Sequence, residues 1–147
     1  SHGITALRRG NEIILTPRHY CYFDYCQTSQ PESEPLCVRH RYLSMRQMYR
    51  LDPFDRVMLH EQERVLGVQA NLWTEYISKY DHAMYMTLPR MSAIAEVGWS
   101  YPNKNYESFL ERLPHLSDLF DVYGYNYAKH VLPEKQNPVA EAGAEQK

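Results

Sequence analysis

The sequence lacks any long hydrophobic run. No apolar stretch in its 147 residues approaches the roughly 20 residues that a helix needs to span a bilayer, and the first residues lack the apolar core of a signal peptide. The sequence therefore predicts no membrane-spanning helix, and we expect the chain as given to be soluble.

An excess of charge of one sign is also missing. The 16 Lys and Arg residues are intermingled with 18 Asp and Glu residues, and the net charge is −2. Nucleic acids and anionic membranes are bound through extended basic faces, so the charge pattern argues against both as partners. Small polar ligands remain the open class of partner.

Cysteine is scarce. Cys21, Cys26 and Cys37 are odd in number and contain no C-x-x-C pair, so they favour neither a structural zinc site nor a complete disulfide framework. We expect Cys21 to be a core residue at the end of a strand. Cys26 and Cys37 either pair across the loop between them or stay reduced, and the cysteine content therefore leaves the redox compartment open.

Histidines with the spacing of a metal site are absent too. His60, Glu61 and Glu63 lie close together in the sequence, but the i, i+4 histidine pair of helical zinc sites does not occur there. We interpret these residues as a solvated approach to the strand that follows. The sequence predicts no metal ion and no other cofactor.

What the chain does contain is enough apolar residues for a core, 44% of the total, and 13 tyrosines. A tyrosine offers a flat apolar face with a hydroxyl at its end, which suits contacts with sugars and equally suits half-buried packing. On composition alone, packing is the favoured interpretation.

The most informative stretch begins with the apolar residues 65–72, whose length suits one buried strand. A polar and aromatic cluster with Trp73, Glu75 and Tyr76 follows directly, as expected where a parallel strand ends at a ligand site. Apolar residues then recur at helical spacing, so the stretch predicts one βα unit. The pattern alone fits two interpretations equally well. Trp73 and Glu75 either belong to a ligand site, or Trp73 is a core residue and Glu75 a solvated strand end.

The N-terminal part repeats this order. Residues 1–9 predict the end of a helix stopped by Gly10, and residues 12–17 predict a buried parallel strand. The loop at residues 19–24 then carries Tyr22 and Asp24. Read without further context, Tyr22 packs on its own loop and Asp24 caps a turn.

Several other segments have simpler predictions. Residues 27–40 read as an extended surface loop, Ser44 as the N-cap of a short helix, and Asp81 as the N-cap of the helix after Glu75. Pro89 must either kink that helix or start a new one. Residues 105–122 predict an amphipathic helix bent at Pro114, and residues 134–147 predict a disordered tail.

The amino-acid sequence of the stretch around Trp73 and Glu75 resembles that of a known family. The segments G-V-Q-A-N-L-W-T-E-Y and P-R-M-S-A-I-A-E-V-G-W-S are similar to the last βα unit of the catalytic barrel in glycoside hydrolase family 20, the β-N-acetylhexosaminidases. The matching positions are Trp73, Glu75, Pro89, Arg90, Ala93, Glu96 and Trp99. Tyr22, Phe23 and Asp24 resemble the Tyr-x-Asp that follows the seventh strand of that barrel.

The resemblance, over residues 3–127, implies an α/β fold. It implies that residues 1–133 form the C-terminal quarter of a (β/α)8 TIM barrel, namely its last two βα units and a C-terminal helix. A complete barrel takes on the order of 250 residues, which exceeds this chain. Two strands alone leave edges unpaired, so we expect self-association or association with the missing part of the barrel.

The family's mechanism implies a division of roles. Catalysis there is substrate-assisted: the 2-acetamido carbonyl of the sugar attacks the anomeric carbon, and the acid is the Glu of an Asp-Glu pair. No Asp-Glu dipeptide occurs in this sequence, so the resemblance implies no catalytic residue here. It implies four substrate-binding residues: Tyr22 and Trp73 at the acetamido group, and Asp24 and Glu75 at the 4- and 6-hydroxyls.

The sequence thus predicts part of a secreted or periplasmic β-N-acetylhexosaminidase that removes terminal N-acetylglucosamine or N-acetylgalactosamine from glycans by retaining catalysis. By itself the chain is expected to be inactive. Two alternatives remain, a non-catalytic sugar-binding remnant and an interaction module that oligomerises through its strand edges.

Overall fold

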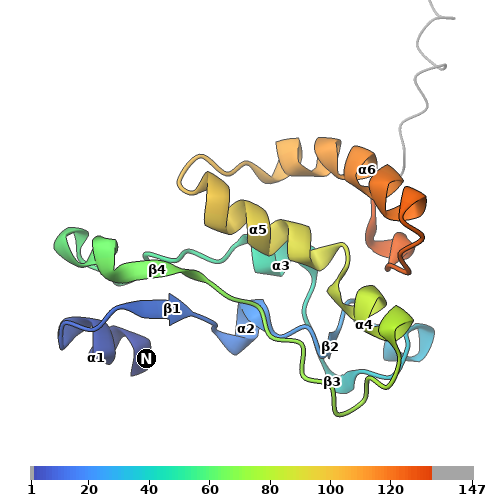
Figure 1. Ribbon diagram of the computed structural model, residues 1–147, viewed down its shortest axis with the longest axis horizontal. Coiled ribbons are helices and arrows are strands. Elements are labelled where there is room, and N and C mark those ends of the chain that lie inside the picture. Colours follow the sequence, from blue (N-terminus) through green and yellow to red (C-terminus); the bar gives the residue numbers. More distant parts are fainter. Residues whose placement is uncertain (1, 134–147) are drawn as a thin grey trace, which may run out of the picture.

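The computed structural model describes residues 2–133, which form a mixed α/β unit (Figure 1). The tail at residues 134–147, for which the sequence predicts disorder, lies outside the described residues. The α-helices are α1 (His2–Arg8), α2 (Arg18–Cys21), α3 (Met45–Tyr49), α4 (Tyr80–Thr87), α5 (Arg90–Ser100) and α6 (Tyr106–Val122). The strands are β1 (Ile13–Leu15), β2 (Tyr25–Cys26), β3 (Val38–Tyr42) and β4 (Val65–Val68). The 3-10 helices are η1 (Pro31–Ser33), η2 (Leu59–Arg64) and η3 (Lys129–Val131).

The two predicted strands form a parallel pair, β1 with β4. A bulge interrupts the pair, because Ile13 lies opposite Val65 while Ile14 lies opposite Gly67. Gly67 has φ +155, a backbone angle that side chains disfavour, so glycine permits this bulge. The strands are shorter than predicted, but the two segments stay paired beyond them. The backbone N–H of Gln69 donates to Leu15 O at 2.9 Å, and that of Asn71 to Cys21 O at 2.8 Å.

Helices cover one side of this parallel pair, where α5 and α6 lie in successive layers (Figure 1). Their apolar side chains meet those of α3 and of the segment after β1. The core residues of these elements include Cys21, Phe23, Met48, Ala93, Val97, Phe109 and Leu113. Cys21 is a fully buried free thiol, as predicted, although it ends the short helix α2 instead of a strand.

Parts of the parallel pair and of its border with α5 are left uncovered. Ile14 is 54% exposed and Leu66 is 59% exposed, although both belong to strands. Among residues 2–133, β1 and β4 pair with each other and with no further strand. Trp99, near the end of α5, is 90% exposed and borders an apolar groove between β4 and α5. No helix within this described part is long and apolar enough to cross a membrane.

The structure corrects four local predictions. Residues 19–24 were expected to be a loop, but α2 occupies part of them. Residues 27–40 are not wholly an extended loop, since they contain η1 and the start of β3. Asp81 does not cap α4, because the helix begins at Tyr80, one residue earlier. Glu61 is buried, not solvated, and its carboxylate accepts a hydrogen bond from the N–H of Met58 at 2.9 Å.

Other local predictions are confirmed. The hydroxyl of Ser44 accepts a hydrogen bond from the N–H of Gln47 at 3.2 Å and thereby caps α3. Pro89 separates α4 from α5, so it starts a new helix and does not kink a continuous one. Gly10 has φ +86 just after α1, where a left-handed residue commonly ends a helix.

Candidate functional site

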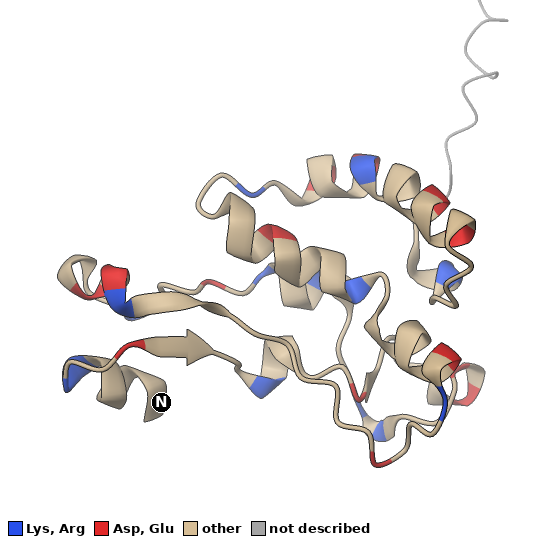
Figure 2. Ribbon diagram, viewed as in Figure 1, with Lys and Arg blue, Asp and Glu red and all other residues tan. Residues whose placement is uncertain are grey.

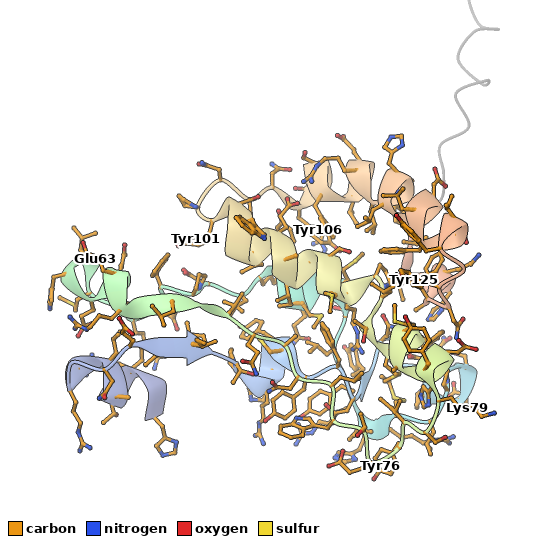
Figure 3. All side chains as sticks on the ribbon, in the orientation of Figure 1. Glu63, Tyr76, Lys79, Tyr101, Tyr106 and Tyr125 are labelled. Carbon is orange, nitrogen blue, oxygen red and sulfur yellow. A yellow bond between two sulfur atoms is a disulfide. The ribbon has the colours of Figure 1, made fainter. Side chains whose placement is uncertain are left out.

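A cleft opens where the segments after β1 and β4 run side by side. Tyr22 and Asn71 form a parallel bridge there, and the N–H of Phe23 donates to Asn71 O at 2.8 Å. The cleft has a volume of about 470 Å3. Its lining residues are Tyr22, Asp24, Val38, Trp73, Glu75 and Tyr76. All four residues predicted to bind substrate therefore lie together, and Figure 3 shows Tyr76 on the loop that follows β4.

Two aromatic rings form one wall of the cleft. The ring centroids of Tyr22 and Trp73 are 5.9 Å apart, and the edge of one ring meets the face of the other. Trp73 is 46% exposed, so it is not a core residue, and one of the two interpretations left open by the sequence is excluded. A half-exposed indole packed against a tyrosine ring suits a ligand with both apolar and polar surface.

Asp24 and Glu75 supply the negative charge of the cleft. Burial raises the pKa of Asp24 above its usual value, the nearby charge of Glu75 adds to this, and the Arg90 guanidinium opposes it. Asp24 Oδ1 is buried and has no hydrogen-bond partner among the described residues. An acceptor of this kind is suited to a ligand hydroxyl. Within residues 2–133, no group of three or more His, Cys, Asp or Glu side chains gathers as a metal site would need.

Arg90 holds the segment that carries Tyr22 and Asp24. Its side chain is fully buried, and Nη2 donates to Phe23 O at 2.6 Å while Nη1 donates to Tyr25 O at 3.0 Å. The same guanidinium also donates to Leu43 O, at 3.1 Å, and to Met86 O. Burial lowers the pKa of Arg90 to about 9, against the raising effects of Glu34 and Asp24.

Arg90 matches a family motif in the sequence, but the motif alone predicts no role for it. The Pro-Arg pair at the start of α5 was the available signal. It could not reveal the role, because three of the four carbonyls that accept from Arg90 lie 47 to 67 residues away along the chain.

Val38 is a second residue that the sequence analysis missed. It is the first residue of β3, and its N–H donates to Asp24 O at 2.9 Å, which places its side chain in the cleft. A disulfide joins its neighbour Cys37 to Cys26, so the paired alternative for these two cysteines is confirmed. The loop closed by this bond is also held by Glu34, whose carboxylate accepts from Gln27 N at 2.8 Å.

Comparison with known proteins identifies the family. Residues 1–102 match the profile of the catalytic domain of glycosyl hydrolase family 20. The chain belongs to this family. Among curated relatives, the chain is 34% identical over 137 residues to a β-hexosaminidase of Porphyromonas gingivalis, a match that covers 90% of this chain and 17% of that protein. It is 26% identical over 136 residues to a β-N-acetylhexosaminidase of Cellulomonas fimi, covering 92% of this chain and 27% of that protein.

Solved structures of the family are similar in fold. The family 20 β-N-acetylhexosaminidase of Streptomyces coelicolor matches with a TM-score of 0.76 and 30% identity over 88% of this chain and 26% of that one. An exo-β-N-acetylglucosaminidase of Vibrio harveyi, solved with N-acetylglucosamine, matches with a TM-score of 0.78 and 30% identity over 87% of this chain and 20% of that one. This family 20 chain thus spans between 17% and 27% of the length of these relatives.

Proposed function

We propose that this chain forms one wall of the sugar-binding site of a β-N-acetylhexosaminidase, and that its strands are the last two of a (β/α)8 barrel. The observation that supports this best is the shared cleft of Tyr22, Asp24, Trp73 and Glu75 at the carboxyl ends of two parallel strands. Active sites of such barrels lie at that end of the strands. The ligand is a terminal N-acetylglucosamine or N-acetylgalactosamine residue.

The aromatic wall orients the reacting group. Tyr22 donates its hydroxyl hydrogen to the acetamido oxygen, and Trp73 shields the acetamido group from water. The oxygen is thereby held where it attacks the anomeric carbon while the glycosidic bond breaks and the leaving oxygen takes a proton from the acid. The oxazolinium ion that forms is then opened by water with net retention. Holding an internal nucleophile in this geometry removes much of the entropic barrier to the reaction.

The carboxylates select the sugar. Asp24 and Glu75 accept hydrogen bonds from the 4- and 6-hydroxyls, and the buried, unpaired Oδ1 of Asp24 supports this role. A site that hydrogen-bonds a hydroxyl discriminates strongly against sugars that present it differently. The acid that protonates the leaving oxygen comes from outside these 147 residues.

The uncovered surfaces of the β1/β4 pair and of the groove beside α5 are proposed to pack against the remaining units of the barrel. Ile14 of β1 is exposed, and so are Leu66 and Trp99, which border the groove. Alone in solution, the 147-residue chain is expected to self-associate, because it leaves strand edges and an apolar groove uncovered. Light scattering at micromolar concentration measures this, and a compact monomer would contradict it.

We also propose a secreted or periplasmic location. The bond between Cys26 and Cys37 supports it, because such bonds persist mainly in oxidising compartments.

Sugar binding is testable by NMR titration of the isotope-labelled chain with N-acetylglucosamine up to about 10 mM, since one wall of a site is expected to bind weakly. The indole N–H signal of Trp73 should move saturably. Trp99, which is 90% exposed and lies outside the cleft, provides an internal control whose signal should stay in place. Glucose, which lacks the acetamido group, should shift Trp73 much less.

The variant Trp73→Ala distinguishes a sugar-binding role of this residue from a role in stabilising the fold. It should abolish saturable shifts elsewhere in the cleft while the rest of the spectrum stays folded. If the spectrum collapses, or if N-acetylglucosamine moves no cleft signal in the natural chain, Trp73 is not a binding wall. An interaction module would then be the better interpretation.

A further inference from the structure

A second hollow lies beside the sugar cleft. It has a volume of about 240 Å3 and is lined by His19, Tyr25, His40, Arg41, Tyr42 and Gln47. Gln47 Nε2 donates to the carbonyl of His19 at 3.1 Å, which fixes one rim of the hollow across two separate elements, α2 and α3. None of its lining residues belongs to the cleft, so the hollow is not part of the site described above.

The two cavities are neighbours across a pair of tyrosine rings. Tyr22 lines the cleft, Tyr25 lines the hollow, and their ring centroids are 5.8 Å apart. Strand β3 also connects them. It contributes Val38 to the lining of the cleft, and His40, Arg41 and Tyr42 to the lining of the hollow. A ligand bound in the cleft can therefore extend into the hollow.

The hollow lies in a basic stretch of a chain that is weakly acidic overall, and Arg41 is the arginine among its lining residues. Between Glu34 and Asp52 the sequence has four arginines and no acidic residue. No ion pair among residues 2–133 involves Arg39 or Arg41 of β3. Figure 2 shows basic positions on β3, next to the loop that follows β4. Arg41, which lines the hollow, is therefore available to a ligand there, whereas Asp24 and Glu75 make the adjoining cleft negative.

We propose that the hollow is a subsite for an acidic sugar unit, one that carries a sulfate ester or a carboxylate and lies next to the terminal N-acetylhexosamine. The inference rests on the proposed function, since it takes the cleft as the place of the terminal sugar. The guanidinium of Arg41 can donate two parallel hydrogen bonds to two oxygens of a sulfate ester or a carboxylate. The exposed ring of Tyr42 offers a face to the sugar itself.

Three disaccharides test this subsite by the same NMR titration of the 147-residue chain. All have N-acetylglucosamine at the non-reducing end, joined to N-acetylglucosamine, to 6-sulfogalactose or to glucuronic acid. At least one acidic disaccharide should bind about tenfold more tightly than the neutral one, as expected of a charge-assisted hydrogen bond. The tighter of the two acidic ligands identifies the anion. Added salt should reduce this advantage.

Two variants test whether Arg41 causes the tighter binding of the acidic disaccharide. Arg41→Gln should remove most of the gain for the acidic ligand and leave the neutral disaccharide unchanged. Arg9→Gln removes the same charge just after α1, at the opposite end of β1 from the cleft, and should change neither. Equal affinities for all three disaccharides, or a gain that survives Arg41→Gln, would overturn the subsite while leaving the sugar cleft intact. Failure of all three to bind would instead count against the proposed function.

Discussion

Replacing Arg90 by glutamine is expected to destabilise the chain by about 3 kcal/mol or more. The guanidinium donates to carbonyls of Phe23, Tyr25, Leu43 and Met86, and the side chain is fully buried. Each buried acceptor left without a donor costs roughly 1–3 kcal/mol, and glutamine can reach at most two. The segment that carries Tyr22 and Asp24 should lose its fixed position at the same time. Urea denaturation followed by circular dichroism measures the loss.

Arg112→Gln is the matched control for this prediction. Arg112 pairs with Glu96 at 2.6 Å; 57% of the Arg112 side chain is exposed to solvent, while that of Glu96 is 11% exposed. Exposed ion pairs contribute roughly 0–1 kcal/mol. Because Glu96 keeps its hydrogen bond from the hydroxyl of Tyr49, at 3.1 Å, when Arg112 is replaced, this variant should lose much less stability than Arg90→Gln. Arg90→Lys keeps the charge and loses the planar fork, so its stability should fall in between. Equal denaturation midpoints for Arg90→Gln and Arg112→Gln would show that Arg90 does not hold the segment.

The second large effect concerns activity. The purified 147-residue chain is expected to show no hydrolysis of an aryl N-acetyl-β-glucosaminide above background. Tyr22, Asp24, Trp73 and Glu75 can hold a sugar, but under the proposed function none of them protonates the leaving oxygen. General acid catalysis is worth on the order of 10²- to 10⁴-fold, and the companion carboxylate that assists the acetamido group is missing as well. A fluorogenic substrate provides the measurement.

Glu75→Gln tests the one carboxylate that could contradict this assignment. Glu75 lies on the exposed loop after β4, beside the cleft, so it is the residue best placed to act as an acid in its own right. Turnover by the natural chain that disappears in the variant would show that Glu75 is a catalytic acid. It would also show that the chain is an enzyme without further units.

The two βα units could be predicted from the sequence because their signals are local. A strand shows as a short apolar run, a helix as apolar residues at helical spacing, and a cap as one side chain at one position. Residues 12–17 and 65–72 therefore contain β1 and β4, and Ser44 caps α3 as expected. The prediction of Asp81 as the N-cap of α4 was wrong because Lys79 and Tyr80 carry no sequence signal for an earlier helix start.

The sequence by itself determined the family and the two βα units, since both depend on motifs of residues that stand near one another in the chain. The family resemblance also singled out Tyr22, Asp24, Trp73 and Glu75, whereas nothing in the sequence predicted α2 or the pairing of β2 with β3. Tertiary structure decided whether Trp73 is buried, what Arg90 holds and how Val38 reaches the cleft. These properties depend on contacts between segments up to 67 residues apart. Such contacts leave no periodic trace in a sequence, because the partner is a backbone carbonyl that every residue type carries.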